Sequence, residues 1–346
     1  MKKRIFLLPT LALMFLGACG SEETTDANQG GGSEAQGETV EFTFAHNLQT
    51  ETPQHQGALK FEELVEQDSD GQIQVAISPA AQLGDEKELM QSVQTGAIKG
   101  AFISTAVLSN ASPVLQLPDL PFLVSERDTM YQLLDGEVGE EILASLEDTG
   151  LKGTAFWESG FKQITANNKI ESPESLNGLQ FRTMESQLIM DTYDAMGANA
   201  VAISFPEVYT ALQQGVVDGQ ENPLSSITSM KFYEVQDYLA LADIAYLGYG
   251  VIFNKDWFDG LPEEQQEVLT NASKETAQFE RQAIADAEEG FISEIEESGT
   301  TVIELSKEQL ASFQEATQPV HDKYKEVLGE DLMEKTYQFI EEIEGQ

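Results

Sequence analysis

The sequence predicts an α/β fold made of two domains. Its 346 residues exceed the roughly 100–200 residues of one ordinary domain. Short stretches that alternate polar and apolar residues are separated by longer stretches with apolar residues at helical spacing. Hydrophobic residues make up 41% of the chain, so each domain can bury a core of its own. Strands that alternate with helices favour parallel sheets covered by helices.

The first 38 residues are predicted to be a secretion signal and a tether. Basic residues at positions 2–4 precede an apolar run over 5–15, which ends in Leu16-Gly17-Ala18-Cys19. A basic start, a short apolar run and small residues before a cleavage point are typical of a signal peptide. The last four residues resemble a bacterial lipobox, in which the cysteine receives a lipid. An ordinary signal peptide with a chance cysteine is the alternative.

Residues 1–18 are therefore expected to form a lipoprotein signal peptide, and 19–38 a flexible acidic tether rich in Gly, Ser and Glu. Cys19 is the only cysteine of the chain. We expect it to anchor the protein in the outer face of the bacterial cell membrane, with the folded part outside the cytoplasm.

Helix and strand signals then alternate along the chain. Alternating or continuous apolar residues predict strands near 41–44, 73–77, 101–103, 153–157, 179–182, 199–203 and 249–253. Apolar residues three or four apart predict helices near 58–70, 85–96, 133–138, 188–196 and 208–214. After Pro262 the pattern is helical almost to the end. A long helix reaches about Ile295, and a capping box at Ser306 and Gln309 opens another.

Charge and composition exclude several functions. The chain has 19 Lys and Arg against 60 Asp and Glu, a formal net charge of −41. Nucleic acid is excluded as a partner because phosphate binding needs basic surface. The histidines at 46, 55 and 321 are far apart in the sequence and lack the spacing of metal ligands. Since no nucleotide-binding loop or nucleophile elbow is present, we predict no cofactor, no metal and no catalytic residue.

The scarce cations are more informative than the many acids. Lys162 follows an apolar strand and a glycine, and Arg182 ends the predicted strand after Gly178. In open α/β sheets, ligands bind beyond the carboxyl ends of strands. A guanidinium there could hold a carboxylate through two parallel hydrogen bonds. From the residues alone, an interior ion pair of Arg182 is an open alternative.

A series of motifs resembles the extracytoplasmic solute receptors of TRAP transporters, in particular the dicarboxylate-receptor branch. They lie in family order from about 40 to 330. The motifs are Phe44-Ala45-His46 with Thr52-Pro53, Gln82-Leu83-Gly84-Asp85, Leu117-Pro118-Asp119-Leu120-Pro121-Phe122, Gly160-Phe161-Lys162-Gln163, Gly178-Leu179-Gln180-Phe181-Arg182, Phe205-Pro206-Glu207-Val208-Tyr209, Gly215-Val216-Val217-Asp218-Gly219-Gln220-Glu221-Asn222-Pro223 and Lys231-Phe232-Tyr233-Glu234-Val235.

The resemblance implies a two-lobe periplasmic-binding-protein-like fold, with strands that cross between the lobes and a long helix that spans both. Lobe I would hold 39–158 and 249–288, and lobe II would hold 159–248 and 289–346. The ligand would bind between them. It would be a small organic acid, most readily a C4-dicarboxylate such as malate, fumarate or succinate, delivered to the membrane subunits of a TRAP permease.

The resemblance also implies the ligand-binding residues. Arg182 would clamp the ligand carboxylate, Lys162 would supply a second positive charge, and Asn222, Asn47 and Ser104 would add polar contacts. Dicarboxylate receptors often carry a lysine shortly after Ser104, whereas this chain has Thr105-Ala106-Val107-Leu108. The alternatives are a sugar acid or an aromatic or branched monocarboxylate as ligand, a ligand-presenting signalling receptor, and an extracellular enzyme on the same scaffold.

Overall fold

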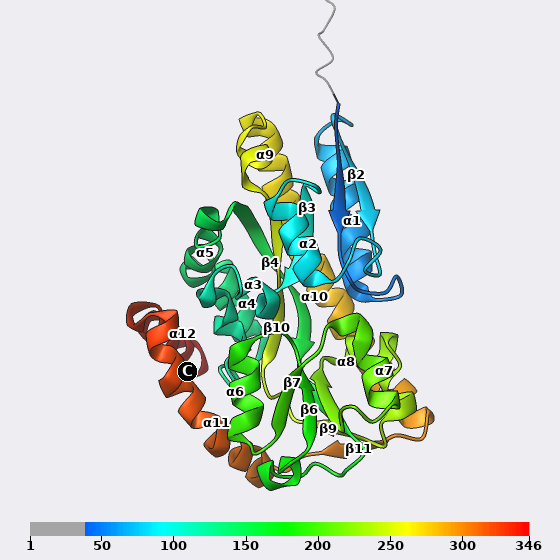
Figure 1. Ribbon diagram of the computed structural model, residues 1–346. Helices are drawn as coiled ribbons and strands as arrows, with labels where there is room; N and C mark the ends of the chain where they lie inside the picture. The colour runs from blue at the N-terminus through cyan, green and yellow to red at the C-terminus, as the bar shows by residue number, and fades with distance from the viewer. Residues whose placement is uncertain (1–38, 346) are drawn as a thin grey trace, which may run out of the picture. The chain divides into compact units, whose positions relative to one another are not determined.

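The computed structural model describes residues 39–345. The predicted signal peptide and tether lie outside the described residues, and so does Cys19. In the described part the strands form two sheets (Figure 1). The first sheet has the order β2-β1-β3-β10-β4 and the second the order β11-β9-β5-β8-β6-β7.

The strands of the first sheet are β1 (Val40–Ala45), β2 (Ile73–Ser78), β3 (Gly100–Ser104), β4 (Leu151–Phe161) and β10 (Tyr246–Asn254). Those of the second are β5 (Gln163–Ala166), β6 (Gln180–Thr183), β7 (Asn199–Ala202), β8 (Gly219–Asn222), β9 (Tyr238–Leu241) and β11 (Thr301–Glu304). Every strand predicted from the sequence is present. The short strands β5, β8, β9 and β11 were not predicted, because they lack a clear apolar alternation.

The expectation of parallel sheets is wrong in part. β1 pairs in parallel with β2 and β3, and β6 pairs in parallel with β7 and β8. However, β10 runs antiparallel to β3 and β4, and β5 runs antiparallel to β8 and β9. The antiparallel strands are the ones at which the chain passes from one sheet to the other and back, so both sheets are mixed.

Two chain segments connect the sheets side by side. β4 continues into β5 through Lys162, and β9 leads into β10 through residues 242–245. The Lys162 amide donates to the Ala245 carbonyl at 2.8 Å, and the Ile244 amide donates to the Lys162 carbonyl at 3.1 Å. The pairing of β4 with β10 thus continues into that of β5 with β9, which confirms the expected crossing strands.

Helices cover both sheets. They are α1 (Pro53–Asp68), α2 (Glu86–Gln94), α3 (Thr105–Leu108), α4 (Arg127–Asp135), α5 (Glu137–Ala144), α6 (Gln187–Ala195), α7 (Val208–Gln213), α8 (Leu224–Ser229), α9 (Lys255–Asp259), α10 (Glu263–Glu297), α11 (Lys307–Leu328) and α12 (Glu330–Glu344). The 3-10 segments are η1 (Pro113–Asp119), η2 (Glu147–Thr149), η3 (Pro173–Leu176), η4 (Phe205–Glu207) and η5 (Phe232–Val235).

The predicted long helix is confirmed as α10. It packs against α1 and β4 on the side of the first sheet and against α8 and β11 on the side of the second. The predicted capping box is also present, since Ser306 accepts from the Gln309 amide and Gln309 accepts from the Ser306 amide. Two predicted helical stretches are each divided at a glycine, α4 from α5 at Gly136 and α11 from α12 at Gly329.

The first sheet holds an aromatic core that fixes β1, β3, β4 and β10 against α1. Phe44, Phe61, Phe102, Trp157 and Phe253 are fully buried, with ring centroids 4.8–6.2 Å apart. Rings of this size dominate core energetics. They fix the ends of β1 and β3 in a rigid position. Asn47 follows the end of β1, and Ser104 is the last residue of β3.

Within residues 39–345, no helix combines the length and apolarity that a membrane span requires.

Candidate functional site

Arg182 is the third residue of β6, a strand between β7 and β8. Its side chain is only 1% exposed. Nε and Nη2 both donate to the Ile203 carbonyl oxygen, at 3.0 and 2.8 Å. Nη1 has no hydrogen-bond partner, and Arg182 forms no ion pair with any described residue. The alternative of an interior ion pair therefore does not describe Arg182 here.

The geometry of Arg182 suits an anion. Because the Ile203 carbonyl occupies the edge formed by Nε and Nη2, the end of the guanidinium formed by Nη1 and the second Nη2 hydrogen remains for another acceptor. Burial lowers the pKa of Arg182 to about 10, an effect opposed by Glu221, Glu86 and Glu185. Arg182 thus stays charged near neutral pH, and its buried charge lacks a directly bonded counterion.

A small cavity of about 20 Å³ adjoins this guanidinium. Its walls come from elements of both sheets. Asn47 follows β1, Glu86 begins α2 and Val107 lies in α3, while Arg182 and Met184 come from β6 and the residue after it. The remaining wall residues are Asp85, Glu185, Ile203, Ser204 and Phe205. A space of this size holds about one water molecule, so an organic acid can enter only if the two walls move apart.

Glu86 is a cavity residue that sequence reasoning missed. It is 6% exposed, and its Oε1 and Oε2 accept from the amide and the hydroxyl of Ser104 at 3.0 and 2.5 Å. Burial raises the pKa of Glu86 to about 7, although the Ser104 bonds and the charge of Arg182 oppose the rise. The available signal was its place beside the N-cap Asp85, where a glutamate is normally only a favourable first-turn acid.

Lys162 does not line the cavity. Its Nζ lies 2.9 Å from Asp119 Oδ1 and 3.5 Å from Glu221 Oε2, and all three side chains are buried. Thr105 donates to the other Asp119 oxygen at 2.8 Å. Although burial alone would lower it, the two carboxylates raise the pKa of Lys162 above its usual value. Lys162 neutralises buried acids here, and a direct contact with ligand stays a prediction.

The other predicted residues divide in the same way. Asn47 lines the cavity, and its Oδ1 is buried without a hydrogen-bond partner. Ser104 reaches the cavity only through Glu86. Asn222 is buried but does not line the cavity, and its Nδ2 donates to Gln220 Oε1 at 2.5 Å. Asn222 adjoins Glu221, which is electrostatically coupled to both Lys162 and Arg182.

His46 and His55 are in contact, although nine positions separate them in the sequence. His46 Nε2 lies 3.1 Å from His55 Nδ1, and the His46 ring stacks on Phe102. Burial, with a smaller effect of His55, lowers the pKa of His46 to about 3. In residues 39–345 no group of three His, Cys, Asp or Glu side chains is placed to hold a metal ion.

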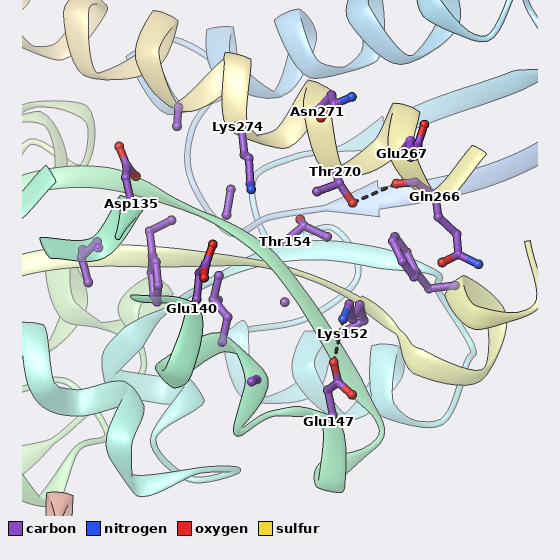
Figure 2. Close-up of a pocket in the computed structure, with 18 of the residues that line it drawn as sticks. Asp135, Glu140, Glu147, Lys152, Thr154, Gln266, Glu267, Thr270, Asn271 and Lys274 are labelled. Carbon is purple, nitrogen blue, oxygen red and sulfur yellow. Dashed lines mark hydrogen bonds and ion pairs between the residues drawn. The ribbon is translucent and has the colours of Figure 1, made fainter. Parts of the chain in front are cut away.

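Figure 2 shows a larger pocket, of about 630 Å³, between α5, β4 and α10. None of the five predicted binding residues lines it. Its carboxylates (Asp135, Glu140, Glu147, Glu263 and Glu267) outnumber its two lysines, and Lys152 is paired with Glu147 at 2.6 Å. The cavity at Arg182 is the better candidate despite its smaller volume, because it is lined by a buried guanidinium with an unpartnered nitrogen.

The comparisons with known proteins agree with this architecture. Residues 44–327 match the family described as bacterial extracellular solute-binding protein, family 7. The C4-dicarboxylate-binding periplasmic protein DctP of Rhodobacter capsulatus is 34% identical over 301 residues, which are 86% of this chain and 90% of that protein. The C4-dicarboxylate-binding protein DctB of Bacillus subtilis is 32% identical over 296 residues, 85% of each chain.

Solved structures share the fold. A TRAP periplasmic solute-binding protein of Sulfurospirillum deleyianum with bound succinate has a TM-score of 0.81 and 34% identity, and covers 86% of this chain and 98% of its own. The sugar acid binding protein DctPAm of Advenella mimigardefordensis, in complex with galactonate, has a TM-score of 0.85 and 31% identity, with 88% and 99% covered. The predicted periplasmic-binding-protein-like fold is thereby confirmed, and the chain belongs to family 7 of the bacterial extracellular solute-binding proteins, the receptors of TRAP transporters.

Proposed function

We propose that this receptor captures a C4-dicarboxylate such as malate, fumarate or succinate outside the cytoplasm and delivers it to the membrane subunits of a TRAP permease. The observation that carries the proposal is the buried guanidinium of Arg182, which lines a cavity between the two sheets and whose Nη1 has no partner. The names of the relatives in Rhodobacter and Bacillus and the succinate-bound neighbour support the ligand class.

Binding would proceed by closure of two lobes around the anion. We place lobe I at 39–158 and 249–288 and lobe II at 159–248 and 289–346, so that Asn47, Glu86 and Ser104 lie on the first and Arg182 on the second. The Nη1 and Nη2 end of Arg182 would meet both oxygens of one carboxylate. Closure removes water and strengthens each charge-assisted bond. A micromolar site needs only about 8 kcal/mol, within reach of such a clamp and a few hydrogen bonds.

Thermal melts of the ligand-free protein with a panel of acids test the ligand class. Malate, fumarate or succinate should raise the melting temperature, because a ligand at a hundredfold excess over its Kd stabilises the folded state by about 2.7 kcal/mol. Glucuronate and galactonate serve as comparison ligands. If these sugar acids raise the melting temperature and every C4 acid leaves it unchanged, the ligand is a sugar acid instead.

We also infer that Cys19 carries a lipid that anchors the receptor to the outer face of the cell membrane. The inference rests on the sequence Leu16-Gly17-Ala18-Cys19 and on the absence of any other cysteine from the 346 residues. A receptor fixed beside its permease delivers ligand without diffusing away.

Cell fractionation of the Cys19→Ala variant tests the anchor. The variant should leave the membrane fraction or stay unprocessed, while its purified folded part binds ligand as before. A variant that still carries a diacyl group in the membrane fraction contradicts the inference. Co-purification of the wild-type protein with permease subunits, and not with a sensor kinase, separates transport from signalling.

A further inference from the structure

We propose that Glu86 makes this receptor select a 2-hydroxy acid, with one ligand carboxylate on Arg182 and the neighbouring hydroxyl donating to the Glu86 carboxylate. The inference rests on the proposed function and narrows it: among C4-dicarboxylates, malate is preferred to succinate and fumarate.

The hydrogen-bonding groups of the cavity favour such a ligand. Arg182 is the one cation among the described residues that line the cavity, and it offers donors only. Two groups from lobe I are acceptors. They are the carboxylate of Glu86 and the buried Oδ1 of Asn47, which has no donor. A ligand that complements both walls therefore presents an acceptor to Arg182 and a donor to lobe I.

Glu86 is held rigidly enough to select. Its side chain is buried, and both of its oxygens are fixed by the amide and the hydroxyl of Ser104. Each carboxylate oxygen has a second acceptor site, so a ligand hydroxyl can bind without displacing Ser104. Succinate presents only C–H groups at the carbon beside its carboxylate, and a second carboxylate placed there would be repelled by Glu86.

The expected preference is moderate. Because Ser104 already satisfies Glu86, succinate leaves Glu86 with its existing partners, and the loss is that of one hydrogen bond to a carboxylate. Such a bond contributes enough to change the affinity by about tenfold or more. Arg182 and Glu86 line the same cavity of about 20 Å³, so the two groups can act on adjacent atoms of one small ligand.

Calorimetric titration of the wild-type protein with both malate enantiomers and with succinate tests the inference. We expect the better malate enantiomer to bind about tenfold or more tighter than succinate. This comparison needs no variant. Equal affinities would overturn the role of Glu86 while leaving the receptor function intact. If no C4 acid binds, the proposed function fails and this inference fails with it.

Two variants locate the preference. Glu86→Gln keeps the size of the side chain but removes its charge, and should bring malate and succinate close to equal affinity. Glu88→Gln is the matched control, since Glu88 is an exposed acid of the same helix and does not line the cavity. It should leave the ratio at its wild-type value. A ratio that persists in Glu86→Gln, or that falls equally in both variants, overturns the inference.

Discussion

Arg182 and Arg281 are both buried guanidinium groups, but only Arg281 meets a carboxylate. Arg281 binds Asp135 through Nη1 and Nη2 at 2.6 and 2.8 Å, the two-bond geometry that guanidinium and carboxylate favour. Arg182 has the same fork, yet its protein contacts are to one backbone carbonyl. The contrast supports our proposal that Arg182 captures an external carboxylate, whereas Arg281 serves the structure.

Exchange of Arg182 for lysine should separate binding from folding. A lysine keeps the charge but cannot copy the planar fork. Arg182→Lys should therefore weaken the binding of malate by about 2–4 kcal/mol, within the range for loss of a buried charge-assisted pair. Its ligand-free stability should fall by no more than about 1.5–3 kcal/mol, the range for a hydrogen bond to a charged group, because the lysine ammonium can still donate to the Ile203 carbonyl. Calorimetric titration and urea unfolding measure the two effects.

Arg281→Lys is the control for this prediction. It should lower the free energy of unfolding, since the bond pair to Asp135 is lost, and leave the affinity for malate unchanged. An Arg182→Lys protein that binds malate like wild type would remove Arg182 from the mechanism.

The role of a single residue can be predicted from the sequence when the residues next to it in the chain carry the signal. Arg182 follows a glycine turn and ends a strand, and both features are local. Lys162 also follows a strand and a glycine. However, its partners Asp119 and Glu221 are 43 and 59 positions away in the sequence. No local pattern indicates that pairing. Glu86 was missed because an acid at a helix start has an ordinary explanation.

Among the elements, α10 carries a buried acid at the point where α1 and β4 pack against it. Glu280 is fully buried, and its Oε2 accepts from the Glu158 amide at 3.1 Å, while its Oε1 has no partner. α1 comes so close that a Cβ added to Gly57 would lie 3.0 Å from Glu280 Cγ. Burial and the Glu158 carboxylate raise the pKa of Glu280 well above its usual value, against the lowering effect of Arg281 and Arg127.

Glu280 should make the free energy of unfolding depend on pH. A group whose folded-state pKa is raised contributes stability that is present below its unfolded value, about 4.5, and is lost as pH rises through the folded pKa. Glu280→Gln removes this loss. The stability of the variant relative to wild type should rise by about 1.4 kcal/mol per pH unit above pH 4.5, until the folded pKa is reached.

Urea unfolding from pH 4 to pH 9 checks this dependence, with Glu289→Gln as the control because Glu289 is an exposed acid of the same helix. Parallel stability profiles of wild type and Glu280→Gln would contradict the prediction, because they would show that ionisation of Glu280 does not lower the free energy of unfolding.

The sequence predicts α10 itself from its apolar spacing. It does not predict Glu280 as a buried residue, because the helix contains many acids that differ from it only in tertiary contacts.

In the whole molecule, the site exists because the chain crosses twice between its sheets. The crossings β4–β5 and β9–β10 are hydrogen bonded at Lys162, where the charged cluster of Asp119 and Glu221 also lies. Movement of the two halves about these crossings would open the cavity at Arg182.

Helix and strand alternation predicts the α/β class, but the mixed strand directions depend on pairings far apart in the sequence. Only the resemblance to a known receptor family indicated the crossing.

Calorimetric titration of the ligand-free wild-type protein with malate, followed by analysis of the recovered ligand, tests the central claim most directly. We predict one binding site per chain, a Kd of about 1 μM or lower and a negative heat-capacity change as apolar walls close, with malate recovered unchanged. The absence of binding by malate, fumarate and succinate to folded protein would contradict the account, and so would their conversion to a product.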